Sequence, residues 1–101
     1  MIVGLLHVEV RVPGARSLKD KRSVVKSLSS QLRGRFNVAV AEVDANETWQ
    51  RATVGVAAVG SDRAYVQGLV KEVADWLRAG HVPGVSRIEE DYLVAGASDA
   101  R

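Results

Sequence analysis

Residues 36–59, FNVAVAEVDANETWQRATVGVAAV, contain two strand-like segments that indicate the fold class. Over 36–41, apolar residues alternate with small or polar ones, which is the period of two expected for a strand. The polar segment 44–48 interrupts this pattern, and a strand rich in Val, Ala and Thr follows over about 49–59. Because the interruption is short, it predicts a turn or hairpin loop, and we expect the two strands to pair directly.

The segment before these two strands predicts a strand and then a helix. Residues 2–12 alternate between two sets of side chains, so one face of this strand is expected to be buried. The buried set is Ile2, Leu6, Val8, Val10 and Val12, and the other set is Val3, Leu5, His7, Glu9 and Arg11. After a Pro-Gly break, Ser17 is expected to cap a helix over about 18–32, and Gly34 is expected to stop it.

The segment after the two strands predicts a second helix and a last strand. Asp62 is expected to cap a helix that runs to about Arg78, because the apolar residues between them recur at helical spacing. A loop containing Gly and Pro follows, and then a strand over about 85–94. The small and polar residues 96–101 are expected to form a flexible C-terminal tail.

This order of elements, β-α-β-β-α-β with a hairpin between the second and third strands, is typical of a ferredoxin-like α+β sandwich. We expect residues 1–95 to form one domain with a four-stranded antiparallel sheet of order 4-1-3-2. Since both crossovers are right-handed, the two helices are expected to cover one face of the sheet. The open face is expected to carry polar side chains and a flat region of small residues. These are His7, Glu9, Arg11, Arg51, Thr53, Arg87, Glu89 and Asp91, and Ala39, Ala41, Gly55 and Ala57.

Composition and charge restrict the class of protein. The 101 residues, 47% hydrophobic and 26% charged, suffice for one domain with its own core. The absence of cysteine excludes disulfides and thiolate zinc sites. Neither a signal peptide nor an apolar run of about 20 residues is found, so we expect a cytoplasmic protein that does not span a membrane. With a net charge of only +2 and a pI near 9.3, attraction to an anionic partner depends on where the charges gather.

Basic residues gather in the first helix. Seven of the 14 Lys and Arg residues lie between Arg16 and Arg35. Four of them fall within a sector of about 60° on a helical wheel, beside the apolar face. These four, called the basic row below, are Lys19, Arg22, Lys26 and Arg33. Such a row can follow the phosphates of a nucleic acid, with Arg16 and Arg35 extending it, although a solvated helix face often has the same composition.

Lys21 lies among the apolar residues of the same wheel, where an isolated charge is unfavourable. Two explanations are open. Its stem can lie along the edge of the core with the ammonium in water, which is the explanation we favour. Alternatively, the ammonium can pair with Glu42 or Asp44 at the far end of the second strand.

The hairpin region joins carboxylates, amides, an indole and a guanidinium. The residues are Glu42, Asp44, Asn46, Glu47, Trp49, Gln50 and Arg51. Such groups can hold a hard cation or stack on a base, but a hairpin in which Trp49 closes the core and Arg51 pairs with an acid explains them equally well. His7 and Glu9 share a strand face, yet two ligands at one spacing do not specify a metal. No metal ligand, cofactor or catalytic residue is therefore assigned.

Four motifs resemble the YlxP family of small uncharacterised bacterial proteins. They are M-I-V-G-x-L, P-G-x-R-S-L-K-x-K-R, R-F-N-V-x-V-A-E-V-D and W-Q-R-A-T-x-G-V. The resemblance covers residues 1–95 and implies a ferredoxin-like fold in a cytoplasmic bacterial protein. Because such proteins are often encoded among translation and ribosome-maturation factors, it also implies an RNA-linked role, without supplying a reaction. The matching positions are Ser17, Leu18, Lys19, Lys21, Arg22, Glu42, Asp44, Trp49, Gln50 and Arg51.

Three functional hypotheses follow from these features. The leading one is a non-enzymatic module that binds structured RNA or a ribosomal assembly through the basic row, supplemented by Arg16, Trp49 and Arg51. The second is a homodimer or protein-interaction module that uses the open sheet face. The third is a small-ligand or phosphate-handling enzyme built on the Arg16 loop and the acids of the hairpin. Apart from these hypotheses, a buried or hairpin polar cluster of Lys21, Glu42, Asp44 and Gln50 is expected.

Overall fold

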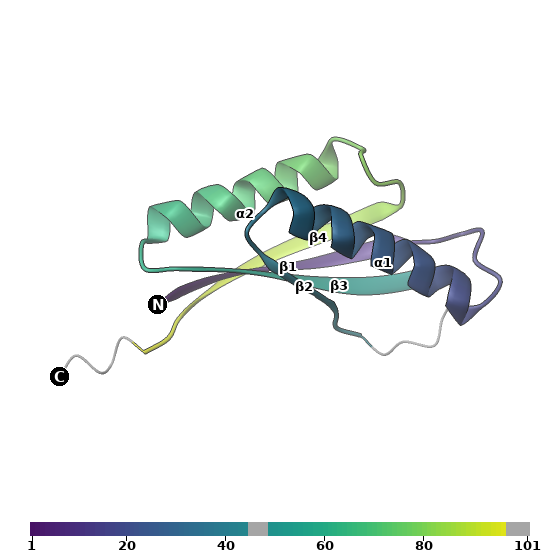
Figure 1. The fold of residues 1–101 in the computed structure, drawn as a ribbon, viewed down its shortest axis with the longest axis horizontal. Helices are drawn as coiled ribbons and strands as arrows, with labels where there is room; N and C mark the ends of the chain where they lie inside the picture. The colour runs from purple at the N-terminus through teal and green to yellow at the C-terminus, as the bar shows by residue number, and fades with distance from the viewer. Residues whose placement is uncertain (45–48, 97–101) are drawn as a thin grey trace.

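The structure, a computed structural model, describes residues 1–44 and 49–96. Within these ranges, four strands and two helices follow the predicted order along the chain (Figure 1). They are β1 (Ile2–Arg11), α1 (Leu18–Arg35), β2 (Ala39–Glu42), β3 (Arg51–Gly60), α2 (Arg63–Arg78) and β4 (Val85–Val94). Residues 97–101, which make up most of the expected C-terminal tail, lie outside the described residues.

The described strands form one antiparallel sheet of order β2-β3-β1-β4. This is the predicted order read from the opposite edge, so the ferredoxin-like α+β topology is confirmed. Both helices lie on the same side of the sheet (Figure 1). There α1 packs on β2 and β3, and α2 packs on β1, β3 and β4. The right-handed crossovers account for this one-sided arrangement.

The core lies between the helices and the sheet. Alternate residues of β1 and β3 are buried there, and the helices add apolar residues at helical spacing. The least exposed large side chains are Leu28, Leu32, Leu77, Val8, Val10, Val54, Val66 and Val73. In β1 the predicted inward set is confirmed at Leu6, Val8 and Val10. Ile2, at the start of this strand, and Val12, just past its end, are only half-buried.

The first helix, α1, begins where the sequence predicts but ends later. The Ser17 hydroxyl accepts a hydrogen bond from the N–H of Asp20 (3.1 Å), so Ser17 is the N-cap. The prediction that Gly34 stops the helix is wrong, because the helix continues past it. Phe36 ends the helix in an extended conformation, and its ring meets Trp76 edge-on with the ring centres 6.2 Å apart. The helix α1 therefore ends at a tertiary contact rather than at a glycine.

The hairpin strands are shorter than the sequence predicts. β2 begins only at Ala39, because residues 36–38 turn the chain from α1 into the sheet. In this turn the N–H of Val38 donates to the Phe36 carbonyl (2.9 Å). β3 begins at Arg51, two residues later than predicted. The alternating pattern therefore extends beyond the residues that pair.

The second half of the chain matches the prediction closely. Asp62 caps α2, since its Oδ2 accepts a hydrogen bond from the N–H of Tyr65 (3.2 Å). The loop before β4 contains two glycines with positive φ, Gly80 (86°) and Gly84 (92°). The Gly84 carbonyl accepts a hydrogen bond from the N–H of Arg11 (2.7 Å). This bond ties the loop to the end of β1.

Candidate functional site

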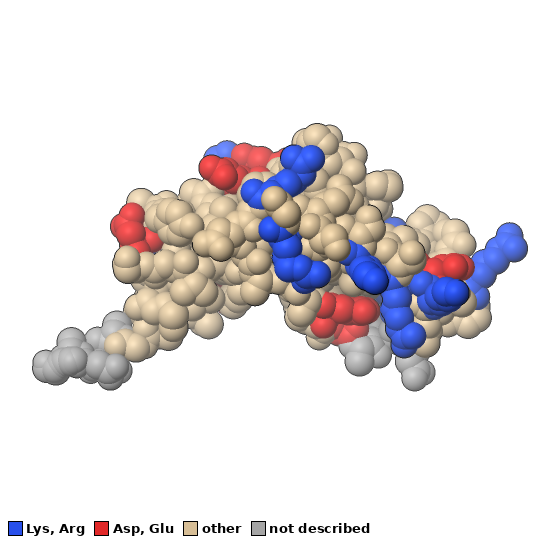
Figure 2. All heavy atoms as spheres, in the orientation of Figure 1, with Lys and Arg blue, Asp and Glu red and all other residues tan. Residues whose placement is uncertain are grey.

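The basic row lies on the exposed surface of α1. Its four members, Lys19, Arg22, Lys26 and Arg33, are all exposed. Figure 2 shows Lys and Arg side chains following the helix along its length. Their spacing of three, four and seven residues places them on one side of α1, over about 21 Å at 1.5 Å per residue.

Within α1, little negative charge offsets this row. α1 contains six basic residues and one acidic residue, a net of +5. The acidic residue, Asp20, accepts a hydrogen bond from the backbone N–H of Arg16 (2.9 Å). None of the ion pairs found among the described residues involves a member of the basic row. The row is therefore a concentrated positive charge that faces solvent, which is what attraction to a polyanion requires.

Arg33 also contacts the edge of the sheet. Its Nη1 donates a hydrogen bond to the carbonyl oxygen of Val40 (3.0 Å), and Val40 belongs to the edge strand β2. Unpaired groups on an edge strand invite pairing with another chain, and a cationic side chain laid against them opposes it. Arg33 thus covers part of this edge while it remains exposed.

The end of α1 leads into an aromatic cluster that the sequence did not predict. The guanidinium carbon of Arg35 lies 5.2 Å from the centre of the Trp76 ring, within cation–π range. His81 stacks on the same indole, with the ring centres 5.2 Å apart and the planes 13° from parallel. Arg35, which was predicted to extend the row, is therefore held against α2. No local pattern in the sequence indicates these contacts, because Arg35, Trp76 and His81 meet only in the folded chain.

Lys21 is buried and does not belong to the basic row. Its side chain is 4% exposed, and its Nζ lies 3.8 Å from Oε2 of Glu42, whose side chain is 30% exposed. The explanation favoured from the sequence, an ammonium in water, is therefore wrong. The structure instead pairs Lys21 with a carboxylate of β2, which links the first turn of α1 to the sheet edge.

We expect Lys21→Met to leave the free energy of unfolding within about 1 kcal/mol of wild type, because an apolar side chain of similar volume avoids the cost of burying a charge. Glu42→Gln is expected to destabilise the protein by about 1–2 kcal/mol, because it weakens the interaction with a buried ammonium. Urea unfolding of both variants measures the two effects. A greater loss in Lys21→Met than in Glu42→Gln would contradict this explanation.

Another member of the hairpin cluster, Gln50, lies against the loop before α1. Gln50 Nε2 donates a hydrogen bond to the carbonyl of Ala15 (3.3 Å) and so holds the loop before α1. Asp44 is exposed. Asn46 and Glu47, which complete the predicted cluster, lie outside the described residues.

Arg51 does not share a surface with the basic row. Its neighbour Ala52 is buried beneath the helices, so Arg51 alternates to the open face, where its cross-strand partner is Arg11. Trp49 lies two residues before the start of β3 and is 45% exposed. The alternation of β3 thus separates Arg51 from the residues it was predicted to supplement.

The open face changes from apolar to charged along β1. Four cross-strand rows, each written from β3 through β1 to β4, are Val59-Val3-Leu93, Ala57-Leu5-Asp91, Gly55-His7-Glu89 and Thr53-Glu9-Arg87. β2 adds Ala39 beside Ala57 and Ala41 beside Gly55. The region of small residues predicted from the sequence therefore borders an acidic edge on β4.

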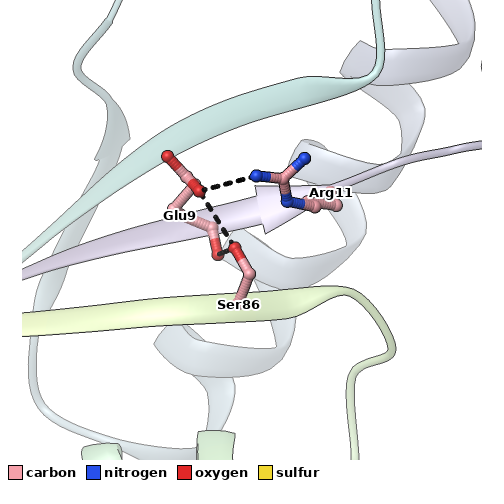
Figure 3. A network of polar contacts seen from close by, with 3 residues as sticks. All are labelled: Glu9, Arg11 and Ser86. Carbon is pink, nitrogen blue, oxygen red and sulfur yellow. Dashed lines mark hydrogen bonds and ion pairs between the residues drawn. The ribbon is translucent and has the colours of Figure 1, made fainter.

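The charged end of this face is joined by a polar network (Figure 3). Oε1 of Glu9 lies 3.7 Å from Nη2 of Arg11, and the Ser86 hydroxyl donates to the same Oε1 (3.1 Å). The hydroxyl also lies 3.3 Å from the Glu9 carbonyl oxygen. The network sits where the register between β1 and β4 shifts, after Glu9. The network therefore connects β1 to β4 through these three side chains.

Metal and membrane sites receive no support from the described residues. Within 1–44 and 49–96, no three His, Asp or Glu side chains gather closely enough to hold a metal ion. Neither α1 nor α2 has the length and apolar character needed to cross a bilayer. The basic row on α1 and the open face of the sheet are thus the two surfaces with a distinctive chemical character.

Comparison with known proteins agrees with the motifs in the sequence. A family described as "Protein of unknown function (DUF503)" matches residues 3–89. The chain is also 35% identical over 72 residues to "Uncharacterized protein YlxP" of Bacillus subtilis (strain 168). That match covers 71% of this chain and 78% of the relative. The resemblance to YlxP-like proteins is confirmed, and the chain belongs to the DUF503 family.

Proposed function

We propose that this protein binds structured RNA, free or within a ribosomal assembly, through the basic row on α1 and without catalysing a reaction. One observation supports this proposal most directly. Four exposed cations lie on one side of a helix with a net charge of +5, and none is in an ion pair found among the described residues. Exposed cations can exchange water and counterions for phosphate oxygens at little cost.

The length of the row suits contact with several phosphates. It spans about 21 Å, whereas one strand of a DNA duplex presents a phosphate about every 3.4 Å along the axis, and an RNA strand is similarly dense in charge. Long Lys and Arg side chains can adjust to the spacing. Contacts of this kind fix the position of a protein on a nucleic acid without reading its bases.

The open sheet face is poorly suited to reading bases. RNA-recognition sheets stack bases on aromatic side chains of their open face. Here the outward-facing strand positions of the described residues carry no Phe, Tyr or Trp, and they include Glu9, Glu89 and Asp91. Carboxylates repel a phosphate backbone. Recognition of RNA shape through α1 is therefore the mode we propose.

Salt dependence tests this proposal. We expect the protein to bind an RNA hairpin in low salt, and log K to fall against log[KCl] with a slope of about −3, as four phosphate contacts imply. Fluorescence anisotropy of a labelled hairpin over a series of KCl concentrations gives the slope. Absence of binding in low salt, or a slope near zero, would rule the proposal out.

A further inference from the structure

The open face of the sheet is hollowed across all four strands. The hollow has a volume of about 650 Å³ and is lined by residues of β1, β2, β3 and β4 together with Val43. Binding sites for small molecules and peptide side chains commonly have volumes of this order. The hollow lies on the side of the sheet opposite the helices, so it is separate from the basic row.

Small and aliphatic residues form the floor of this hollow. Leu5 lies beside Ala57, which in turn lies beside Ala39. A Cβ on Gly55 would lie 2.7 Å from Cγ1 of Val43, so the missing side chain allows Val43 to lie over β3. Val43 is 52% exposed. The floor therefore offers exposed apolar surface to another molecule.

The apolar surface continues beyond the hollow toward the start of β1. Val59 and Leu93 flank Val3 across the sheet and are 52% and 50% exposed. Contiguous exposed apolar residues on a soluble domain mark sites of interaction. An occupant of the hollow can extend over this row and bury it as well.

The charge beside the hollow is negative. Two acids of β4 that face this side of the sheet, Glu89 and Asp91, are among its lining residues, whereas Glu90 between them lies opposite the buried Leu6 and directs its side chain to the helix side. No Lys or Arg is among the lining residues in the described part of the chain. Glu89 pairs with Arg87 at 3.1 Å, and Glu90 accepts a hydrogen bond from the Tyr92 hydroxyl (2.9 Å). Burial and, second, this hydrogen bond raise the pKa of Tyr92 above its ordinary 10.0.

Asp91 is the acid best placed to meet an incoming cation. It lies directly across from Leu5 in the register, at the boundary between apolar floor and acidic edge. Its Oδ1 accepts a hydrogen bond from the N–H of Tyr92 (2.8 Å), and it forms no ion pair with any residue the structure describes. A carboxylate in this position can accept a second, charge-assisted hydrogen bond.

We propose that this hollow docks a segment of another protein that carries a Lys or Arg side chain next to aliphatic ones. The aliphatic side chains would cover Leu5 and its small neighbours, and the cation would reach Asp91. The same acids disfavour RNA on this face. They also disfavour a second copy of the chain, which would bring its own acidic strand against this one.

The test uses a short soluble peptide of alternating Lys and Leu, with a peptide of alternating Gln and Leu as its neutral control. We expect the Lys peptide to bind the full-length protein and to shift the backbone amide NMR signals of Leu5, Ala57 and Asp91. The Gln peptide should bind at least about fivefold more weakly, because it lacks the attraction to the carboxylates.

Three variants locate the site. Asp91→Asn should weaken binding of the Lys peptide about fivefold, whereas Glu72→Gln, an exposed acid on α2, should change it by less than about twofold. Ala57→Phe should fill the hollow and abolish binding while the protein stays folded by circular dichroism. Equal binding of both peptides, shifts confined to other surfaces, or self-association that buries this face and excludes the peptide would each overturn the proposal.

Discussion

Gly84→Ala is expected to destabilise the protein by about 3 kcal/mol. Gly84 has a φ of 92°, a conformation that L side chains rarely adopt. A Cβ at this position would also collide with the carbonyl oxygen of Arg11. The loop cannot move away easily, because the Arg11 N–H donates to the Gly84 carbonyl (2.7 Å). Urea unfolding followed by circular dichroism measures the loss.

The control for this variant is Gly68→Ala. Gly68 lies in the interior of α2, and no heavy atom outside the local helix backbone lies within 4 Å of the place where its Cβ would be. We therefore expect Gly68→Ala to stabilise the protein by about 0.5–1 kcal/mol, because Ala forms helix better than Gly. If both variants changed the free energy of unfolding by a similar amount in the same direction, the positive φ and close approach at Gly84 would not explain the effect.

Removing three charges of the basic row is expected to have the largest effect on function. In the variant Lys19→Gln, Arg22→Gln, Lys26→Gln, we expect affinity for an RNA hairpin to fall about 100-fold at low salt, at roughly 1 kcal/mol for each lost phosphate contact. The slope of log K against log[KCl] should become shallower by about 2 to 3. Stability should change little, because all three side chains are exposed. Fluorescence anisotropy measures both binding quantities.

The matched control removes the same number of charges from the second helix. Arg63, Lys71 and Arg78 are exposed on α2 and become Gln in the control variant, which therefore has the same net charge as the first. We expect its affinity for RNA to fall less than about fivefold, because this variant weakens only the overall electrostatic attraction of the protein to RNA. Equal losses in the two variants would mean that net charge, rather than the basic row, determines binding.

Much of the fold could be predicted from the sequence because its signals are local. The alternation in β1 and the caps Ser17 and Asp62 each depend on residues close in sequence, and the structure contains all three. The end of α1 could not be predicted in this way. It coincides with the contact between Phe36 and Trp76, which are far apart in the sequence and meet only after α2 has packed.

The functional surfaces also include features that the local sequence predicts and features that depend on tertiary structure. The exposure of the basic row followed from helical spacing, because a side chain beside the apolar face of an amphipathic helix points to water. The pairing of Lys21 with Glu42 depends on where β2 lies against α1, so the sequence left two explanations open. The hollow on the open face depends on the shape of all four strands together, and no local pattern predicts it.

Mapping the RNA contact by NMR shows which face of the protein meets RNA. Amide signals of the full-length protein would be recorded during titration with an RNA hairpin in low salt. We predict that the largest shifts fall on α1 and the residues just before it, from Arg16 to Arg33, while Leu5, Ala57 and Asp91 on the open face stay unchanged. Shifts concentrated on the open face, or none on α1, would contradict the claim that this protein meets RNA through its basic helix.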